Sequence, residues 1–207
     1  MKTNRRLPGA GERVPADTRA AMRAVRRALL FPVAIILLAA PAGLQGQRPG
    51  TDGSDEAAFL RAVGEHFSVP QQEVMVLAQW KLAPGEIPVA LFLAERAGVS
   101  PDVVISQRRR GEGWMAISSE YSVHAGDFHV RIDGHAGILA DAYERFSARA
   151  ASEWNEIVLS DDEVVGFVNL RFLSRHLQVS PERVARELED VDGVVAVFVR
   201  LRSTGGP

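Results

Sequence analysis

Residues 86–121 read EIPVALFLAERAGVSPDVVISQRRRGEGWMAISSEY, and much of this pattern recurs eighty residues further along the chain. The two copies share a phenylalanine–leucine pair, a corner of valine, serine, proline and an acid, and then a valine, a glycine and an alanine. These landmarks stand at 92–93, 99–102, 104, 113 and 116 in one copy and at 172–173, 179–182, 184, 193 and 196 in the other. A match at a fixed offset indicates one structural unit used more than once.

Each copy predicts a helix, a tight corner, a second helix, a short turn and a third helix. Residues 88–97 contain no internal breaker, and Gly98 follows where a helix end favours a left-handed residue. Ser100 and Pro101 are typical of an N-cap and a first helical residue, so a new helix is expected at once. The arginines before Gly111 suit the negative end of that helix.

A fainter third copy comes earlier, with Phe59 and Leu60 followed by Val69 and Pro70. We therefore expect an all-α fold, an array of short helices built from two to three related helix–corner–helix units. The units span about 57–85, 86–121 and 160–202 within one domain, 56–207. A flexible polar lead-in, 47–55, precedes this domain.

Residues 1–46 have the order of a secretory signal peptide. Arg23, Arg26 and Arg27 precede thirteen apolar residues, 28–40, and Ala40 and Ala42 are small residues of the kind that define a cleavage site. Met22 would begin a more compact signal, which makes it an alternative start. A membrane anchor is the other interpretation, although a span needs about 20 apolar residues. We expect export to the periplasm or cell surface, with membrane contact only through an uncleaved signal.

The charge changes sign after the signal segment. Residues 1–46 hold eight Lys and Arg against two Asp and Glu, which leaves sixteen against twenty-four in residues 47–207. An acidic domain is a poor match for the phosphate backbone, so no nucleic-acid partner is expected.

Three local patterns add further predictions. Ser160 and Glu163 form a capping box, which predicts a helix that ends near Leu177. Residues 194–202 have the valine-rich composition of a strand, but their place in the repeat favours a helix. Residues 124–133 alternate apolar and polar side chains, which predicts a short extended linker near 124–133. A strand at 194–202 paired with residues 128–132 is the alternative.

The repeated F-L-x6-S-P-[D/E] unit, with a tryptophan after G-x-G, resembles a group of short exported bacterial proteins. The resemblance covers most of residues 59–201. It implies the helical fold and export, and it assigns no activity and no catalytic residue.

Arg108, Arg109, Arg110 and Trp114 are the candidate binding residues. The triplet is the densest positive charge in the acidic domain, and successive helical residues point about 100° apart, so the three cannot share one internal partner. An anionic envelope component or an acidic protein is the partner they would suit. A plain helix end with a surface ion pair is the alternative.

A second candidate set consists of possible metal ligands close together in the chain: His124, Asp127, His129, Asp133 and His135. Their spacing matches no zinc motif.

Residues 102–121 also resemble a helix-turn-helix. The second helix, WMAISSEY, would contact the DNA bases, but it lacks the Arg, Lys, Asn and Gln side chains that bind base edges.

The chain shows no nucleophile motif, phosphate loop or cysteine, and no cofactor is expected. The leading hypothesis is an exported, non-catalytic binding or structural module of the bacterial envelope. The alternatives are a metal-dependent envelope enzyme that uses residues 124–135 and a DNA-binding protein with a misread N-terminus.

Overall fold

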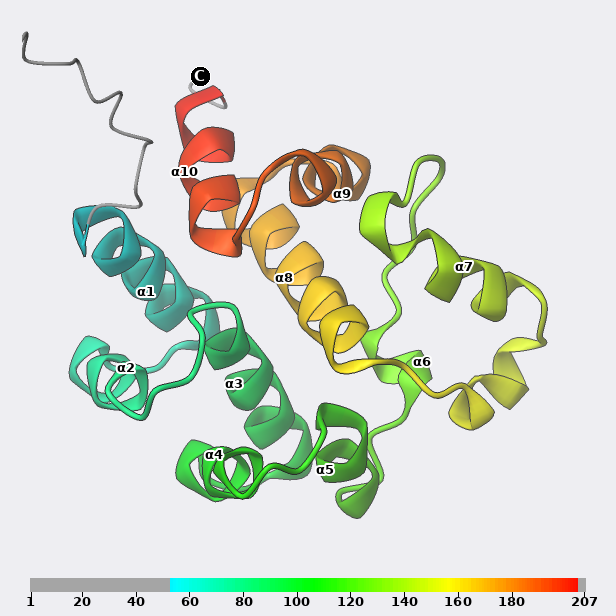
Figure 1. Ribbon diagram of the computed structural model, residues 1–207, viewed down its shortest axis with the longest axis horizontal. Coiled ribbons are helices and arrows are strands. Elements are labelled where there is room, and N and C mark those ends of the chain that lie inside the picture. Colours follow the sequence, from blue (N-terminus) through cyan, green and yellow to red (C-terminus); the bar gives the residue numbers. More distant parts are fainter. Residues whose placement is uncertain (1–52, 205–207) are drawn as a thin grey trace, which may run out of the picture. The chain divides into compact units, whose positions relative to one another are not determined.

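The computed structural model describes residues 53–204, and every regular element in that range is a helix (Figure 1). The predicted signal segment, its alternative start at Met22 and residues 47–52 lie outside the described residues. The elements are α1 (Gly53–Phe67), α2 (Gln71–Ala78), α3 (Glu86–Ala97), α4 (Pro101–Arg109), α5 (Trp114–Glu120), α6 (Ala125–Phe128), η1 (Gly137–Leu139), α7 (Ala140–Ser147), η2 (Ala151–Glu156), α8 (Asp161–Leu177), α9 (Pro181–Asp190) and α10 (Val194–Thr204). None of these helices is long and apolar enough to cross a membrane.

The all-α prediction is therefore confirmed, and the repeat corresponds to recurring helices. Helices α3, α4 and α5 occupy the same places in the sequence pattern as α8, α9 and α10. Helices α1 and α2 match the first two helices of this unit. The lead-in is shorter than expected, because α1 already begins at Gly53, where Asp55 and Glu56 lie in its favourable first turn.

The two corners share their backbone conformation but differ in their caps, because Ser100 stands at the N-cap of α4 without a side-chain capping hydrogen bond in the described residues. Gly98 ends α3 with a φ of 67°, and Gln178 ends α8 with a φ of 55°. Both residues are left-handed, although only glycine adopts that conformation without a Cβ penalty. The hydroxyl of Ser180 caps α9 by accepting a hydrogen bond from the Arg183 N–H at 3.3 Å.

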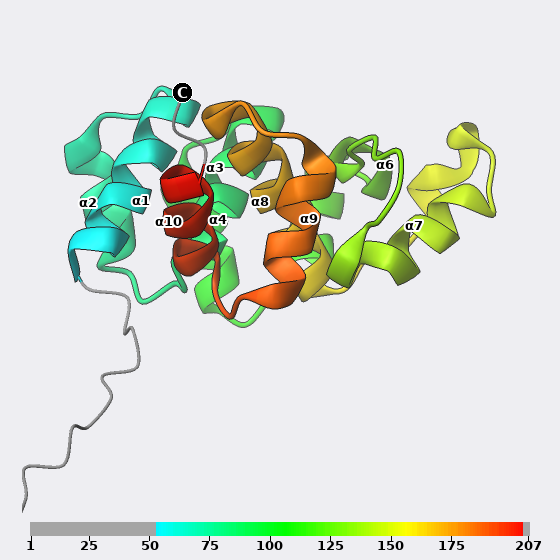
Figure 2. The ribbon, with the colours of Figure 1, turned by 90° about the horizontal axis from the view of Figure 1, so that it is seen from above.

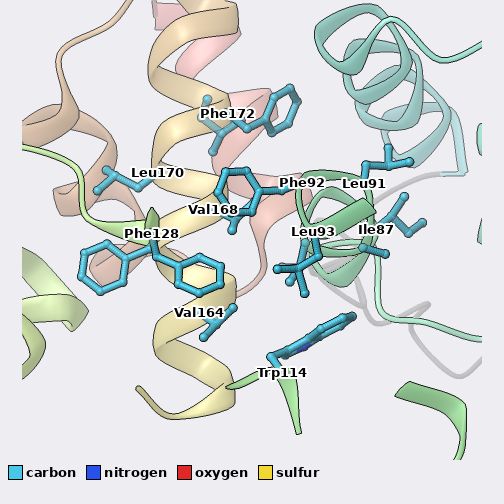
Figure 3. Packing of buried hydrophobic residues seen from close by; sticks show 14 of the residues in the cluster. Ile87, Leu91, Phe92, Leu93, Trp114, Phe128, Val164, Val168, Leu170 and Phe172 are labelled. Carbon is cyan, nitrogen blue, oxygen red and sulfur yellow. The ribbon is translucent and has the colours of Figure 1, made fainter. Parts of the chain in front are cut away.

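The core lies where the first helices of the three units meet. Helix α1 contacts α3 and α8, and α3 also packs on α8. The Phe59 ring stands edge-on to Phe172 at 5.7 Å and to Phe198 at 5.8 Å. Figure 3 shows Phe92 of α3 beside Val168 of α8 in this core. The first unit thus packs directly on the last one and not only on its neighbour in the sequence.

Helix α8 starts with the predicted capping box. The Ser160 hydroxyl accepts a hydrogen bond from the Glu163 N–H at 3.2 Å, and the Glu163 carboxylate accepts one from the Ser160 N–H at 2.8 Å. Leu159 and Val164 are both buried, as the predicted apolar contact across the cap requires.

Residues 194–204 form a helix, so the strand alternative is wrong. Val195, Phe198 and Leu201 are buried at helical spacing, and Phe198 packs on Phe59 of α1. Packing of one helical face against the core overrides the strand preference of the valines.

The extended linker predicted near 124–133 is wrong in its first part, because Ala125–Phe128 form one helical turn, α6. The Asp127 carboxylate accepts a hydrogen bond from the His124 N–H at 2.9 Å, which favours the turn over an extended chain. Residues 129–132 are free of helix, and Val130 and Ile132 pack against the core. Figures 1 and 2 show the following helix, α7, at the end of the domain away from α1 and α2.

Candidate functional site

The arginine triplet at the end of α4 points in three directions, as expected. Arg109 lies exposed with its guanidinium 5.9 Å from the centre of the Trp80 ring. Arg110 forms an ion pair with Glu112 at 2.8 Å on the surface. Arg108 turns inward. The three cations therefore do not form one binding surface.

Arg108 connects three helices beneath the surface. Its guanidinium donates to Glu86 of α3 at 2.9 Å, to Asp161 of α8 at 2.6 Å and to the Glu112 carbonyl at 3.1 Å. Burial alone lowers the pKa of Arg108, but the hydrogen bonds to Glu86 and Asp161 outweigh it and raise this pKa. These contacts make Arg108 a structural cross-link that is not free to bind a partner.

Trp114 is completely buried, and its ring lies 4.9 Å from the Arg108 guanidinium. Figure 3 shows it beside Ile87 and Leu93 of α3. Its backbone N–H donates to Asp161 at 2.7 Å, so the same carboxylate that pairs with Arg108 also caps α5. A ligand has no direct access to Trp114 in this structure.

The candidate metal ligands are not brought together. Asp127 pairs with Arg96 at 2.9 Å, Asp133 pairs with Arg131 at 3.2 Å, and His135 contacts Glu189 at 2.5 Å. His124 is exposed. No group of three potential ligands within residues 53–204 could hold a metal ion.

His129 instead belongs to an aromatic cluster. Its ring lies 4.4 Å from the Trp154 ring and 4.9 Å from the Phe146 ring. Burial lowers the pKa of His129, and the charge of Arg171 lowers it further. The neutral imidazole packs as an aromatic side chain at neutral pH.

Helix α5, which would read DNA in a helix-turn-helix, turns Trp114, Ile117 and Ser118 into the core. Ala116, Ser119 and Glu120 are exposed on it. This face offers a carboxylate and no cation to a phosphate backbone, which it would repel.

A polar pocket of about 100 Å³ lies between α1, α3 and α8. The residues that line it are His66, Phe67, Phe92, Glu95, Arg96, Val168, Arg171, Phe172 and Arg175. It is hereafter called the basic pocket, because its lining residues include three arginines and one histidine but only one acidic residue. Helices α3 and α8, which provide most of the lining, hold equivalent places in the repeat.

Arg171 is held rigidly at this pocket. Its Nη2 donates to the carbonyls of Asp127, Phe128 and His129, at 2.8, 3.1 and 2.9 Å. These carbonyls belong to the end of α6, which is the negative end of the turn. The Arg171 guanidinium also lies 5.3 Å from the centre of the Phe92 ring, and the Arg96 guanidinium lies 5.2 Å from it.

Burial first, and positive charge second, lower two pKa values around the pocket. Burial lowers the pKa of His66, and His176 and Arg175 lower it further. Burial also lowers the pKa of Arg171, together with the charges of Arg175 and Arg96. A bound anion would raise the pKa values of both His66 and Arg171 again.

Two larger and mostly apolar cavities, of about 360 and 410 Å³, meet at Val165, Gly193 and Val194. Asn169 lines the second one, and it donates from Nδ2 to the Gly85 carbonyl at 2.8 Å. Among residues 53–204, its buried Oδ1 has no hydrogen-bond partner. These cavities have the size of small-molecule sites but offer few polar groups for recognition.

The basic pocket was not among the sites predicted from the sequence. One signal for it was present, since Arg171 and Arg175 are four residues apart on α8 beside the apolar Val168 and Phe172. Two cations four residues apart on one helical face repel each other, and an anion or an acid beside them would relieve this repulsion. Arg96 and His66 join them only through the tertiary fold.

No known protein family, curated protein or solved structure matches this chain.

Proposed function

We propose that this chain is an exported, non-catalytic binding module of the bacterial envelope. The observation that supports binding is the basic pocket, where Arg96, Arg171 and Arg175 gather in a domain that is otherwise acidic. The helices that carry these cations pack into one core, so the site has a rigid support. The basis for export is the charged, apolar and small-residue order of residues 23–42.

The export half of the proposal is tested by the N-terminus of the protein in its native host. We expect mass spectrometry of envelope fractions to find a chain that begins between Gly43 and Gln47. A control chain with Leu30 and Ile35 both changed to Arg should stay uncleaved in the cytosol, because a charged core is not accepted as a signal. An intact, cytosolic wild-type chain would refute export and favour the DNA-binding alternative.

A further inference from the structure

Positive charge in the basic pocket is only partly balanced. Asp127 pairs with Arg96 at 2.9 Å, and Glu65 lies 3.9 Å from the neighbouring His176. Glu95 is the one carboxylate among the lining residues. Neither Arg171 nor Arg175 forms an ion pair within residues 53–204. In this range, Arg171 is a half-buried cation without a paired carboxylate, which is unfavourable, so the pocket would gain from an anion.

Arg171 and Arg175 also retain donors that the fold does not use. In the described part of the chain, the side-chain hydrogen bonds of Arg171 all come from Nη2, which leaves Nε and Nη1 available. The Arg175 side chain is exposed and makes no hydrogen bond there. Guanidinium groups donate in pairs to oxyanions such as phosphate and carboxylate.

The size of the pocket restricts the ligand. A volume of about 100 Å³ corresponds to roughly three water molecules, far below the volume of a drug-sized site. One tetrahedral oxyanion group fits this space. Two guanidiniums with unused donors beside one small volume suit a group with more than two acceptor oxygens, which favours phosphate over carboxylate.

We infer that the basic pocket binds a single phosphate group, with Arg171 and Arg175 as its main donors and Arg96 and His66 at its edge. This inference assigns a ligand class, phosphate, to the binding module proposed above. It rests on that proposal for the location of the protein in the envelope. Arg171 is already fixed by three carbonyls and the Phe92 ring, so little side-chain freedom is lost on binding.

The direct test is calorimetric titration of the full chain with inorganic phosphate at constant ionic strength. We expect saturable binding of one phosphate per chain. Arg175→Ala should weaken it at least about tenfold, because it removes charged hydrogen bonds. Arg186→Ala is the matched control, since Arg186 is an exposed arginine of α9 that does not line the pocket. This variant should bind within about twofold of the wild type.

Arg175 is exposed, so both variants should keep the melting temperature of the wild type. Absence of saturable phosphate binding in the wild type would overturn the inference. Equal weakening in both variants would also overturn it, because that result shows only diffuse attraction by net charge.

The phosphate group could belong to a lipid headgroup or to a free ligand, and a vesicle-binding experiment distinguishes the two. Flotation with phosphatidylcholine vesicles, with and without phosphatidic acid, measures binding to a lipid headgroup. Binding that needs phosphatidic acid and is displaced by inorganic phosphate assigns the site to a headgroup, and no flotation together with calorimetric binding assigns it to a free phosphate ligand. Flotation that neither phosphate nor Arg175→Ala reduces would contradict the site. Failure of this site leaves the export result untouched, and failure of export leaves the phosphate result untouched.

Discussion

At the scale of single residues, neighbours in the chain have different roles. Arg108 is enclosed by Glu86, Asp161 and the Trp114 ring, while Arg109 lies on the surface next to Trp80. Sequence alone gives these two arginines the same character. Their positions about 100° apart on α4 decide which one becomes a cross-link.

Arg108→Ala should therefore destabilise the domain by about 2 kcal/mol, between the values for exposed and for fully buried ion pairs. It leaves Glu86 and Asp161 without their cation. Arg109→Ala, the matched control, should cost less than about 0.5 kcal/mol. Urea unfolding of both variants measures the difference. Equal losses would mean that Arg108 does not hold α3 and α8 together.

At the scale of elements, the corners after α3 and α8 have the same backbone conformation but different residues. Gly98 and Gln178 are both left-handed, with φ of 67° and 55°. In the described part of the chain, no atom beyond the glycine and its two chain neighbours lies within 4 Å of a Cβ built on Gly98, so the conformation and not crowding accounts for the glycine. A non-glycine residue in this region costs about 1–2 kcal/mol.

Gln178→Gly should accordingly stabilise the protein by about 0.5–1 kcal/mol, since glycine removes the penalty but is more flexible in the unfolded chain. The reciprocal change, Gly98→Gln, should destabilise it by a similar amount. Thermal unfolding of the two variants would reveal opposite shifts. A loss of stability in Gln178→Gly would show that the hydrogen bond from its side chain to the Arg175 carbonyl, at 2.6 Å, outweighs the strain.

At the scale of the whole domain, residues 53–204 do not behave as an open stack of repeats. Phe59 of the first unit packs on both Phe172 and Phe198 of the last one. In an open array each repeat contacts only its neighbours, and unfolding can proceed repeat by repeat. Here the three units share one core.

We expect this domain to unfold in a single cooperative step. Tryptophan fluorescence reports on Trp80, Trp114 and Trp154, which lie in different parts of the chain, and far-UV circular dichroism reports on all the helices. Urea curves from the two probes should coincide. Two separated transitions would mean that one unit unfolds independently of the others.

Local signals determined much of this fold. The glycine after α3, the serine–proline pairs at both corners and the capping box of α8 each act within about four residues, so they can be interpreted without knowing the rest of the structure. The place of residues 194–202 in the repeat also predicted their helical state, against their strand-like composition. The turn at Ala125–Phe128 was missed because one hydrogen bond, from the His124 N–H to Asp127, outweighs an alternating pattern.

The sequence by itself thus determined an all-helical domain of related units and, as a hypothesis, its export. Only the tertiary structure decided which charged groups meet. Arg108 reaches Asp161 across 53 positions, and the basic pocket joins His66, Arg96 and Arg175 from three helices. Local preferences act through backbone geometry and extend over one helical turn, whereas a pocket forms only when distant helices pack on a common core.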